Sequence, residues 1–209
     1  MNELKNSLVE VRKAYRLLYD YQKKVLDLVQ FIGTEFGRSY NGGYSKYCNV
    51  TPRNGKGYLS NWAWDWLNMY YYEFSFHNKE NKDFFSVVLI SDTGYYEAKD
   101  EDENFNDKLE INKYKDVENS STKLSLVYGD KIWECDGFLK NDCWEDPKFI
   151  LGNQGVYAKE NNLSKMIFKS YNLEEFSNKE SAIRILRDFS SFCIDNGINL
   201  KLKRDYENE

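Results

Sequence analysis

One spacing of charged residues in this chain could support hydrolytic chemistry. Asp83 stands directly before an apolar run at residues 84–91, and Glu97-Ala98-Lys99 follows after a short turn. Two carboxylates that meet can hold a divalent metal ion, and a neighbouring lysine can steady the water that the metal activates. If Asp83, Glu97 and Lys99 converge, they predict a metal-dependent phosphodiesterase.

This spacing resembles that of nucleases with the restriction-endonuclease-like fold, which place an acidic residue at one strand end and Glu-x-Lys on the next strand. The resemblance covers residues 83–99 and implies catalytic roles for Asp83, Glu97 and Lys99. The alternative is a set of surface charges on a hairpin. A turn at residues 92–94 would return Glu97 toward the middle of strand 84–91, away from Asp83, so the alternative is favoured.

Other catalytic and metal-binding patterns find little support. The chain has a single histidine, His77, which excludes sites that need two imidazoles. Its four cysteines, at positions 48, 135, 143 and 193, contain no C-x-x-C pair, so a zinc ribbon is not indicated. We therefore expect that the protein holds no metal ion and no cofactor. We also expect that His77 is exposed to solvent.

An aromatic ribbon is the most prominent feature of the chain. Side chains alternate between the two faces of a strand, so rings at every second position share one face. That face is either a buried core or a binding platform, and the core is favoured because interleaved Asp65 and Glu73 suit nucleic acid poorly. The rings are Trp62, Trp64, Trp66, Tyr70, Tyr72, Phe74 and Phe76.

A loop rich in glycine, asparagine and serine precedes the ribbon at residues 37–61. It lacks the strand, glycine and helix order of a nucleotide-binding fingerprint, but connections of this length are often functional. Together with the start of the ribbon it supplies the candidate contact residues for a partner. These are Tyr44, Arg53, Trp62, Trp64 and Trp66.

The first element that must position these groups is a long helix over residues 4–36, ended by Gly37. Apolar residues recur there in alternating steps of four and three, and Gln22 is the polar residue at one position of this repeat. A seven-residue repeat can form a coiled-coil dimer seam, which leaves a homodimer possible. We favour a helix that lies on its own sheet, since the aromatic face needs a cover.

Several shorter elements complete the predicted sheet. After strand 84–91, the chain turns into residues 95–97, and Gly129-Asp130 predicts a two-residue hairpin between strands 124–128 and 131–135. Further short strands are expected at 149–151, 156–158 and 166–171. The last element is an amphipathic helix with a capping box from Ser177 to Glu180 and a stop at Gly197.

These elements predict one α+β domain over residues 1–209, with a long N-terminal helix and a C-terminal helix packed on an antiparallel sheet of five or six strands. An acidic stretch at 99–122 is expected to be a mobile insertion. The formal charge of −5 argues against nonspecific nucleic-acid binding, and no apolar run is long enough for a membrane span. We expect a non-catalytic cytoplasmic binding or regulatory protein with a protein or small-molecule partner.

Overall fold

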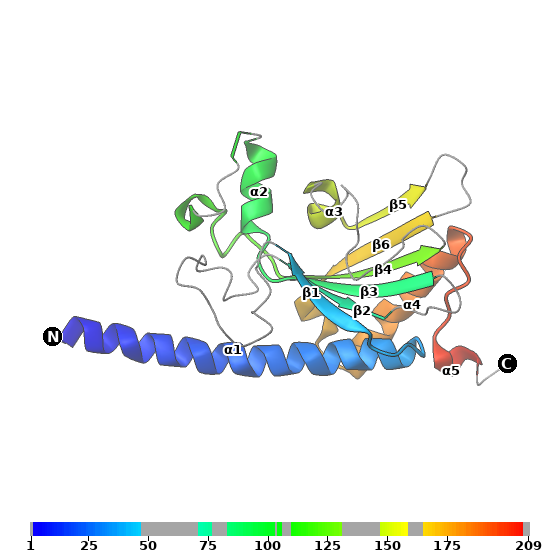
Figure 1. The fold of residues 1–209 in the computed structure, drawn as a ribbon, viewed down its shortest axis with the longest axis horizontal. Coiled ribbons are helices and arrows are strands. Elements are labelled where there is room, and N and C mark those ends of the chain that lie inside the picture. The colour runs from blue at the N-terminus through cyan, green and yellow to red at the C-terminus, as the bar shows by residue number, and fades with distance from the viewer. Residues whose placement is uncertain are drawn as a thin grey trace.

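A six-stranded antiparallel sheet forms the centre of the molecule, with helices on both of its faces (Figure 1). The computed structural model describes residues 2–46, 71–76, 83–102, 104–105, 110–130, 147–158 and 165–206. The strand order is β1-β2-β3-β4-β6-β5, and every neighbouring pair is antiparallel. The strands are β1 (Gly42–Lys46), β2 (Tyr71–Ser75), β3 (Asp83–Ile90), β4 (Lys123–Asp130), β5 (Gln154–Ala158) and β6 (Lys165–Asn172).

The predicted α+β architecture is confirmed, including the long N-terminal helix and the C-terminal helix. Helix α1 ends at Glu35, and Gly37 adopts a positive φ of 65° that lets the Arg38 amide bond back to the Gly33 carbonyl. The helices are α1 (Asn2–Glu35), α2 (Gly94–Glu101), α3 (Pro147–Leu151), α4 (Lys179–Asp195) and α5 (Lys203–Tyr206), with 3-10 turns η2 (Ile111–Lys113) and η4 (Leu173–Phe176).

One face of the sheet is covered by α4 and by the C-terminal half of α1 (Figure 1). The strands supply the apolar side chains that point toward these two helices, and the resulting core is fully buried at its centre. Helix α1 therefore lies on its own sheet from Val25 onward, as predicted. The residues that these helices supply to the core are Val25, Val29 and Ile32 of α1, Phe36 directly after α1, and Ile185, Leu186, Phe189 and Cys193 of α4.

The opposite face of the sheet is covered by α2 and α3 (Figure 1). Tyr95 and Tyr96 of α2 and Phe149 and Ile150 of α3 are buried against this face. Every residue of the central strand β3 is consequently buried, and both of its faces are apolar except at Asp83 and Ser86. This explains why its sequence shows a continuous apolar run instead of alternation.

The described part of the aromatic ribbon behaves as predicted. Phe74 and Phe76 are buried in the core under α1 and α4, and Tyr72 packs against that core. Tyr71 points to the other face and is buried there. The rings at 62, 64, 66 and 70 lie outside the described residues.

Four local predictions are wrong. Residues 95–97 and 149–151 were expected in strands but lie in α2 and α3. Residues 42–46, expected in a loop, form β1 at the edge of the sheet. The cap of α4 is Asn178, whose side chain accepts a hydrogen bond from the Ser181 amide at 2.9 Å, so the box lies one residue after the predicted Ser177.

The acidic stretch at 99–122 is only partly described, and its mobility stays a prediction, as does the single domain. The stretch contributes two rings to the core beneath α2. Phe105 and Tyr114 lie with ring centroids 5.9 Å and 5.6 Å from the Tyr95 ring. Such aromatic contacts add to the burial of Tyr95.

The expected hairpin at Gly129-Asp130 is also wrong, because both residues continue strand β4. Gly129 pairs with Phe84, and Asp130 pairs with Asp83, in the register with β3. A Cβ atom at position 129 would overlap the ring of Phe84, which lies across the glycine. Glycine is required here for a close approach between neighbouring strands and not for a turn.

This contact predicts a strong and local effect of Gly129→Ala. The added methyl group must displace the Phe84 ring, and overpacking of this kind costs about 1–3 kcal/mol of the free energy of unfolding. Urea denaturation of the variant measures the loss. In a Phe84→Leu background the same substitution should cost less, because the smaller side chain leaves room. An equal cost in both backgrounds would contradict the role assigned to the ring.

Candidate functional site

Asp83, the first candidate catalytic residue, lies in a compact ion pair at the start of β3. Arg38 follows the end of α1 and donates from Nη1 to Oδ1 of Asp83 at 2.9 Å and from Nη2 to Oδ2 at 2.7 Å. The Tyr128 hydroxyl of β4 donates to the same Oδ2 atom at 2.5 Å. Both partners of the ion pair are largely buried, with 14% and 8% of their side-chain surfaces exposed.

The electrostatics of this cluster suit a structural role. Burial raises the pKa of Asp83, but the hydrogen bonds from Arg38 and Tyr128 and the positive charge of Arg38 outweigh burial, so the pKa lies below its ordinary value. Burial and the bond to Asp83 raise the pKa of Tyr128. The carboxylate is therefore ionised and already compensated by a bidentate guanidinium. It joins the end of α1 to the sheet.

Glu97 and Lys99 lie in α2, at the other end of β3 from Asp83. A strand of this length spans about 23 Å, so the structure does not bring Asp83 together with Glu97 and Lys99. Glu97 instead accepts a hydrogen bond from the Thr93 hydroxyl at 2.7 Å in the first turn of α2. Among the described residues, no group of three or more His, Cys, Asp or Glu side chains could hold a metal ion.

Of the candidate contact residues, only Tyr44 is described. It lies in β1, where it pairs with Glu73 of β2. Arg53, Trp62, Trp64 and Trp66 lie outside the described residues, so their proposed contacts with a partner stay predictions. His77 also lies outside them, and its solvation stays a prediction.

A row of buried polar side chains lies on the sheet face toward α2 and α3, and sequence reasoning did not identify it. Glu73 is only 1% exposed, and it accepts a hydrogen bond from the Ser86 hydroxyl at 2.7 Å. Ser75 pairs with Ser86, while the hydroxyls of Ser125 and Ser170 lie 2.6 Å apart. The alternation of β2 places Glu73 on this face, although a glutamate side chain is usually exposed to solvent. These two bonds pair Oε1 of Glu73 and the serine hydroxyls within the sheet.

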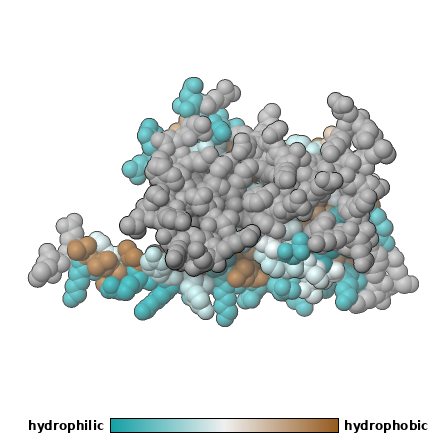
Figure 2. Space-filling model, in the orientation of Figure 1, coloured by the Kyte–Doolittle hydropathy of each residue, from teal (hydrophilic) through white to brown (hydrophobic). Residues whose placement is uncertain are grey.

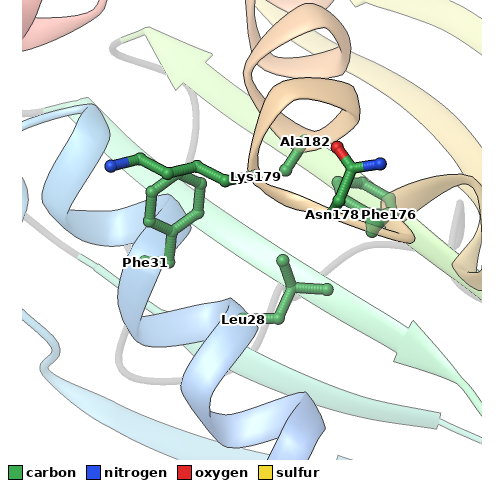
Figure 3. A pocket seen from close by; sticks show the side chains of 6 residues that line it. All are labelled: Leu28, Phe31, Phe176, Asn178, Lys179 and Ala182. Carbon is green, nitrogen blue, oxygen red and sulfur yellow. The ribbon is translucent and has the colours of Figure 1, made fainter.

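A pocket of about 270 Å³ opens between α1 and the start of α4 (Figure 3). Most of its lining is apolar, and of its two polar residues Asn178 already caps α4. The pocket offers few groups that could orient a ligand, so it suits a small apolar group more than a polar substrate. It is lined by Leu28, Phe31, Phe176, Asn178, Lys179 and Ala182.

The N-terminal half of α1 presents a larger apolar surface. This half extends past the edge of the sheet (Figure 1), and hydrophobic side chains gather along it (Figure 2). Of residues 4–20, all but Val9 are exposed. The repeat that supplies the core of the C-terminal half continues here, and none of the described residues covers it. We call these residues the exposed stripe: Leu4 (68% exposed), Leu8 (47%), Val11 (47%), Tyr15 (68%) and Leu18 (47%).

One flank of the exposed stripe is basic. Steps of seven, four and seven residues return to nearly the same direction on a helix, so four basic residues follow one line beside the stripe. In the part of the chain that the structure describes, none of the four forms a salt bridge. We call this set the basic edge: Lys5, Arg12, Arg16 and Lys23.

No helix in the described ranges is both long enough and apolar enough to cross a membrane.

Comparison with known proteins gives a family and a short match to a relative. The family model described as PM0109 matches residues 1–198. The relative "Uncharacterized protein PM0109" of Pasteurella multocida (strain Pm70) is 51% identical over 39 residues, which are 19% of each protein. The match thus spans about a fifth of the relative's length. No solved structure matches the chain.

The Asp83 cluster predicts a pH-dependent stability. Because the pKa of Asp83 is lower in the folded state than in the unfolded chain, its contribution is complete above about pH 5 and is lost as the pH falls through the folded-state pKa. Asp83→Asn leaves Arg38 uncompensated and should cost about 3 kcal/mol at pH 7. Urea denaturation between pH 7 and pH 3 should show a flatter pH dependence for this variant.

Asp188→Asn is the matched control for this measurement. Burial raises the pKa of Asp188, but hydrogen bonds from Lys169 and Tyr171 outweigh burial and lower it below the ordinary value. The Asp188 side chain is, however, 49% exposed. Its loss should therefore cost less than the loss of Asp83. Equal stability of the wild type and Asp83→Asn at pH 7 would contradict the structural role of the ion pair.

Proposed function

The chain belongs to the PM0109 family, and we propose that it is a non-catalytic cytoplasmic binding protein that uses the N-terminal half of α1 to bind a protein partner. The partner contributes an amphipathic helix that covers the exposed stripe. The observation that carries this proposal is the continuation of the apolar repeat beyond the sheet, where its side chains are 47–68% exposed. Cys193 is a buried free thiol, which accords with a reducing compartment.

A large exposed apolar surface is unusual on a monomer and typically belongs to an interaction site. The same repeat in residues 25–36 is buried by the sheet, which supports a buried contact for the exposed stripe as well. In the N-terminal half, a second helix can fill the equivalent place. Two helices pack well when a seven-residue repeat on each supplies the contact.

The size of the stripe also favours a helix over a smaller ligand. Complete burial of one such side chain contributes about 1.5–3 kcal/mol, so five contribute at most about 8–15 kcal/mol. Association costs about 4–15 kcal/mol in lost freedom of motion. Most of the stripe must therefore be covered at once, and residues 4–18 extend over about 21 Å of helix. A partner helix reaches that far, whereas a small molecule does not.

The alternative function, a metal-dependent phosphodiesterase, draws less support from the geometry. It needs Asp83, Glu97 and Lys99 around one metal ion, and these residues lie at opposite ends of β3. The carboxylate of Asp83 is occupied by Arg38 and Tyr128. The binding protein is thus the better-supported proposal.

Site-specific photo-crosslinking tests the proposed function. Replacement of Tyr15 by benzoylphenylalanine keeps a ring in the exposed stripe, and replacement of Lys13 places the same group on the opposite side of α1. In a lysate of the native host, position 15 should crosslink to a distinct protein and position 13 should not. Peptide mapping should locate the crosslink on an apolar helix face of the partner.

A variant of the stripe separates binding from folding. Leu8→Gln/Val11→Gln should abolish the crosslink at position 15, because it removes apolar contacts without adding charge. The free energy of unfolding should change by less than about 0.5 kcal/mol, since neither side chain lies in the core. Equal crosslinking at positions 13 and 15, or a crosslink that persists in the double variant, would reject this role for the stripe.

A further inference from the structure

We propose that the partner helix carries acidic side chains along one flank and belongs to a different protein, not to a second copy of this chain. This inference rests on the proposed function and specifies the partner of the same stripe. The feature that carries it is the basic edge, which runs beside the exposed stripe along its whole length. Residues that flank a helical seam determine which partner is accepted.

The charge of α1 differs from that of the whole protein. Residues 4–24 contain six basic and two acidic residues, although the chain has a formal charge of −5. Lys13, on the far side of α1, is paired with Glu10 at 2.9 Å. The four residues of the basic edge, in contrast, have no salt bridge among the described residues. Acidic side chains on a partner would complement them and accelerate the encounter.

A second copy of the chain fits this surface poorly. In an antiparallel pair, two-fold symmetry brings each flank of the seam against the same flank of the other copy, so the basic edge would face itself. In a parallel pair, both sheets would lie at the same end. Each sheet stands on the seam side of its own α1, because the sheet buries the repeat residues Val25, Val29 and Ile32, so the two sheets would compete for one space.

A flat anionic surface also fits poorly, for a steric reason. The sheet stands on the side of α1 that carries the apolar repeat (Figure 1), so a membrane that met the stripe along its length would run into the sheet. A helix about 10 Å wide can lie beside the exposed half. Nucleic acid would use the basic edge but would leave the apolar stripe without a contact.

Two synthetic peptides test the inference with the full chain. Both are amphipathic helices about three heptads long with leucine at the seam positions; one carries glutamate at the flanking positions, and the other carries lysine there. Fluorescence anisotropy should show binding of the glutamate peptide at least tenfold tighter than that of the lysine peptide at about 50 mM salt. The difference should shrink at about 500 mM salt, where exposed charges are screened.

Charge reversal provides the matched variants. Lys5→Glu/Arg12→Glu/Arg16→Glu should reverse the preference, so that the lysine peptide binds more tightly. Lys13→Glu, a reversal on the far side of α1, should leave the preference unchanged. Leu8→Gln/Val11→Gln should weaken the binding of both peptides, because it removes part of the exposed stripe.

The outcomes distinguish this inference from the proposed function. If both peptides bind equally and the stripe variant abolishes binding, the stripe is a docking site but the acidic partner is rejected. If neither peptide binds, the acidic partner is rejected. Light scattering would then identify a second copy of the chain as the partner if it detects a dimer and the stripe variant is monomeric. Binding to phosphatidylglycerol vesicles that depends on the stripe would reject the inference in favour of a membrane surface.

Discussion

The packing of the C-terminal half of α1 against the sheet is the contact on which the rest of the structure depends. Strand β3 is apolar on both faces, so the sheet is stable only when helices cover both sides. On one side α1 and α4 share that role, and the Arg38–Asp83 ion pair joins the end of α1 to the first residue of β3. The direction of α1 is therefore determined by the core, and its N-terminal half must continue in that direction past the sheet.

Much of this architecture could be predicted from periodicity. The steps of four and three in the C-terminal half of α1 and in α4, and the alternation around Phe74 and Phe76, correspond to faces that the structure buries. Periodicity reports which side of an element is apolar, although the exposed stripe shows that an apolar side need not be buried. It does not report what lies on the other side of a contact. Gly129 illustrates this limit, since a glycine in a turn and a glycine beneath the Phe84 ring look identical in sequence.

The candidate site was less predictable for the same reason. The nuclease-like spacing of Asp83, Glu97 and Lys99 assumed that Glu97 follows on a strand, whereas Thr93 and Glu97 form a hydrogen bond within the first turn of α2. A glutamate usually lies at the surface, whereas Glu73 is buried and accepts a hydrogen bond from a hydroxyl of the next strand. In each case a partner distant in sequence, or a local competing bond, determined the outcome. Neither can be read from residue types alone.

The length of α1 relative to the sheet bears most directly on function. A helix that served only to cover the sheet could begin near Tyr21, where contact with the core starts. The chain instead keeps large apolar side chains at the repeat positions as far as Leu4, at a cost in solubility. It also has basic residues along one flank of those positions. If these residues only had to be soluble, acidic side chains would serve equally well. An apolar seam with one charged flank is the form that a helix takes when another helix is to lie against it, and in the described structure only the C-terminal half of that seam is covered.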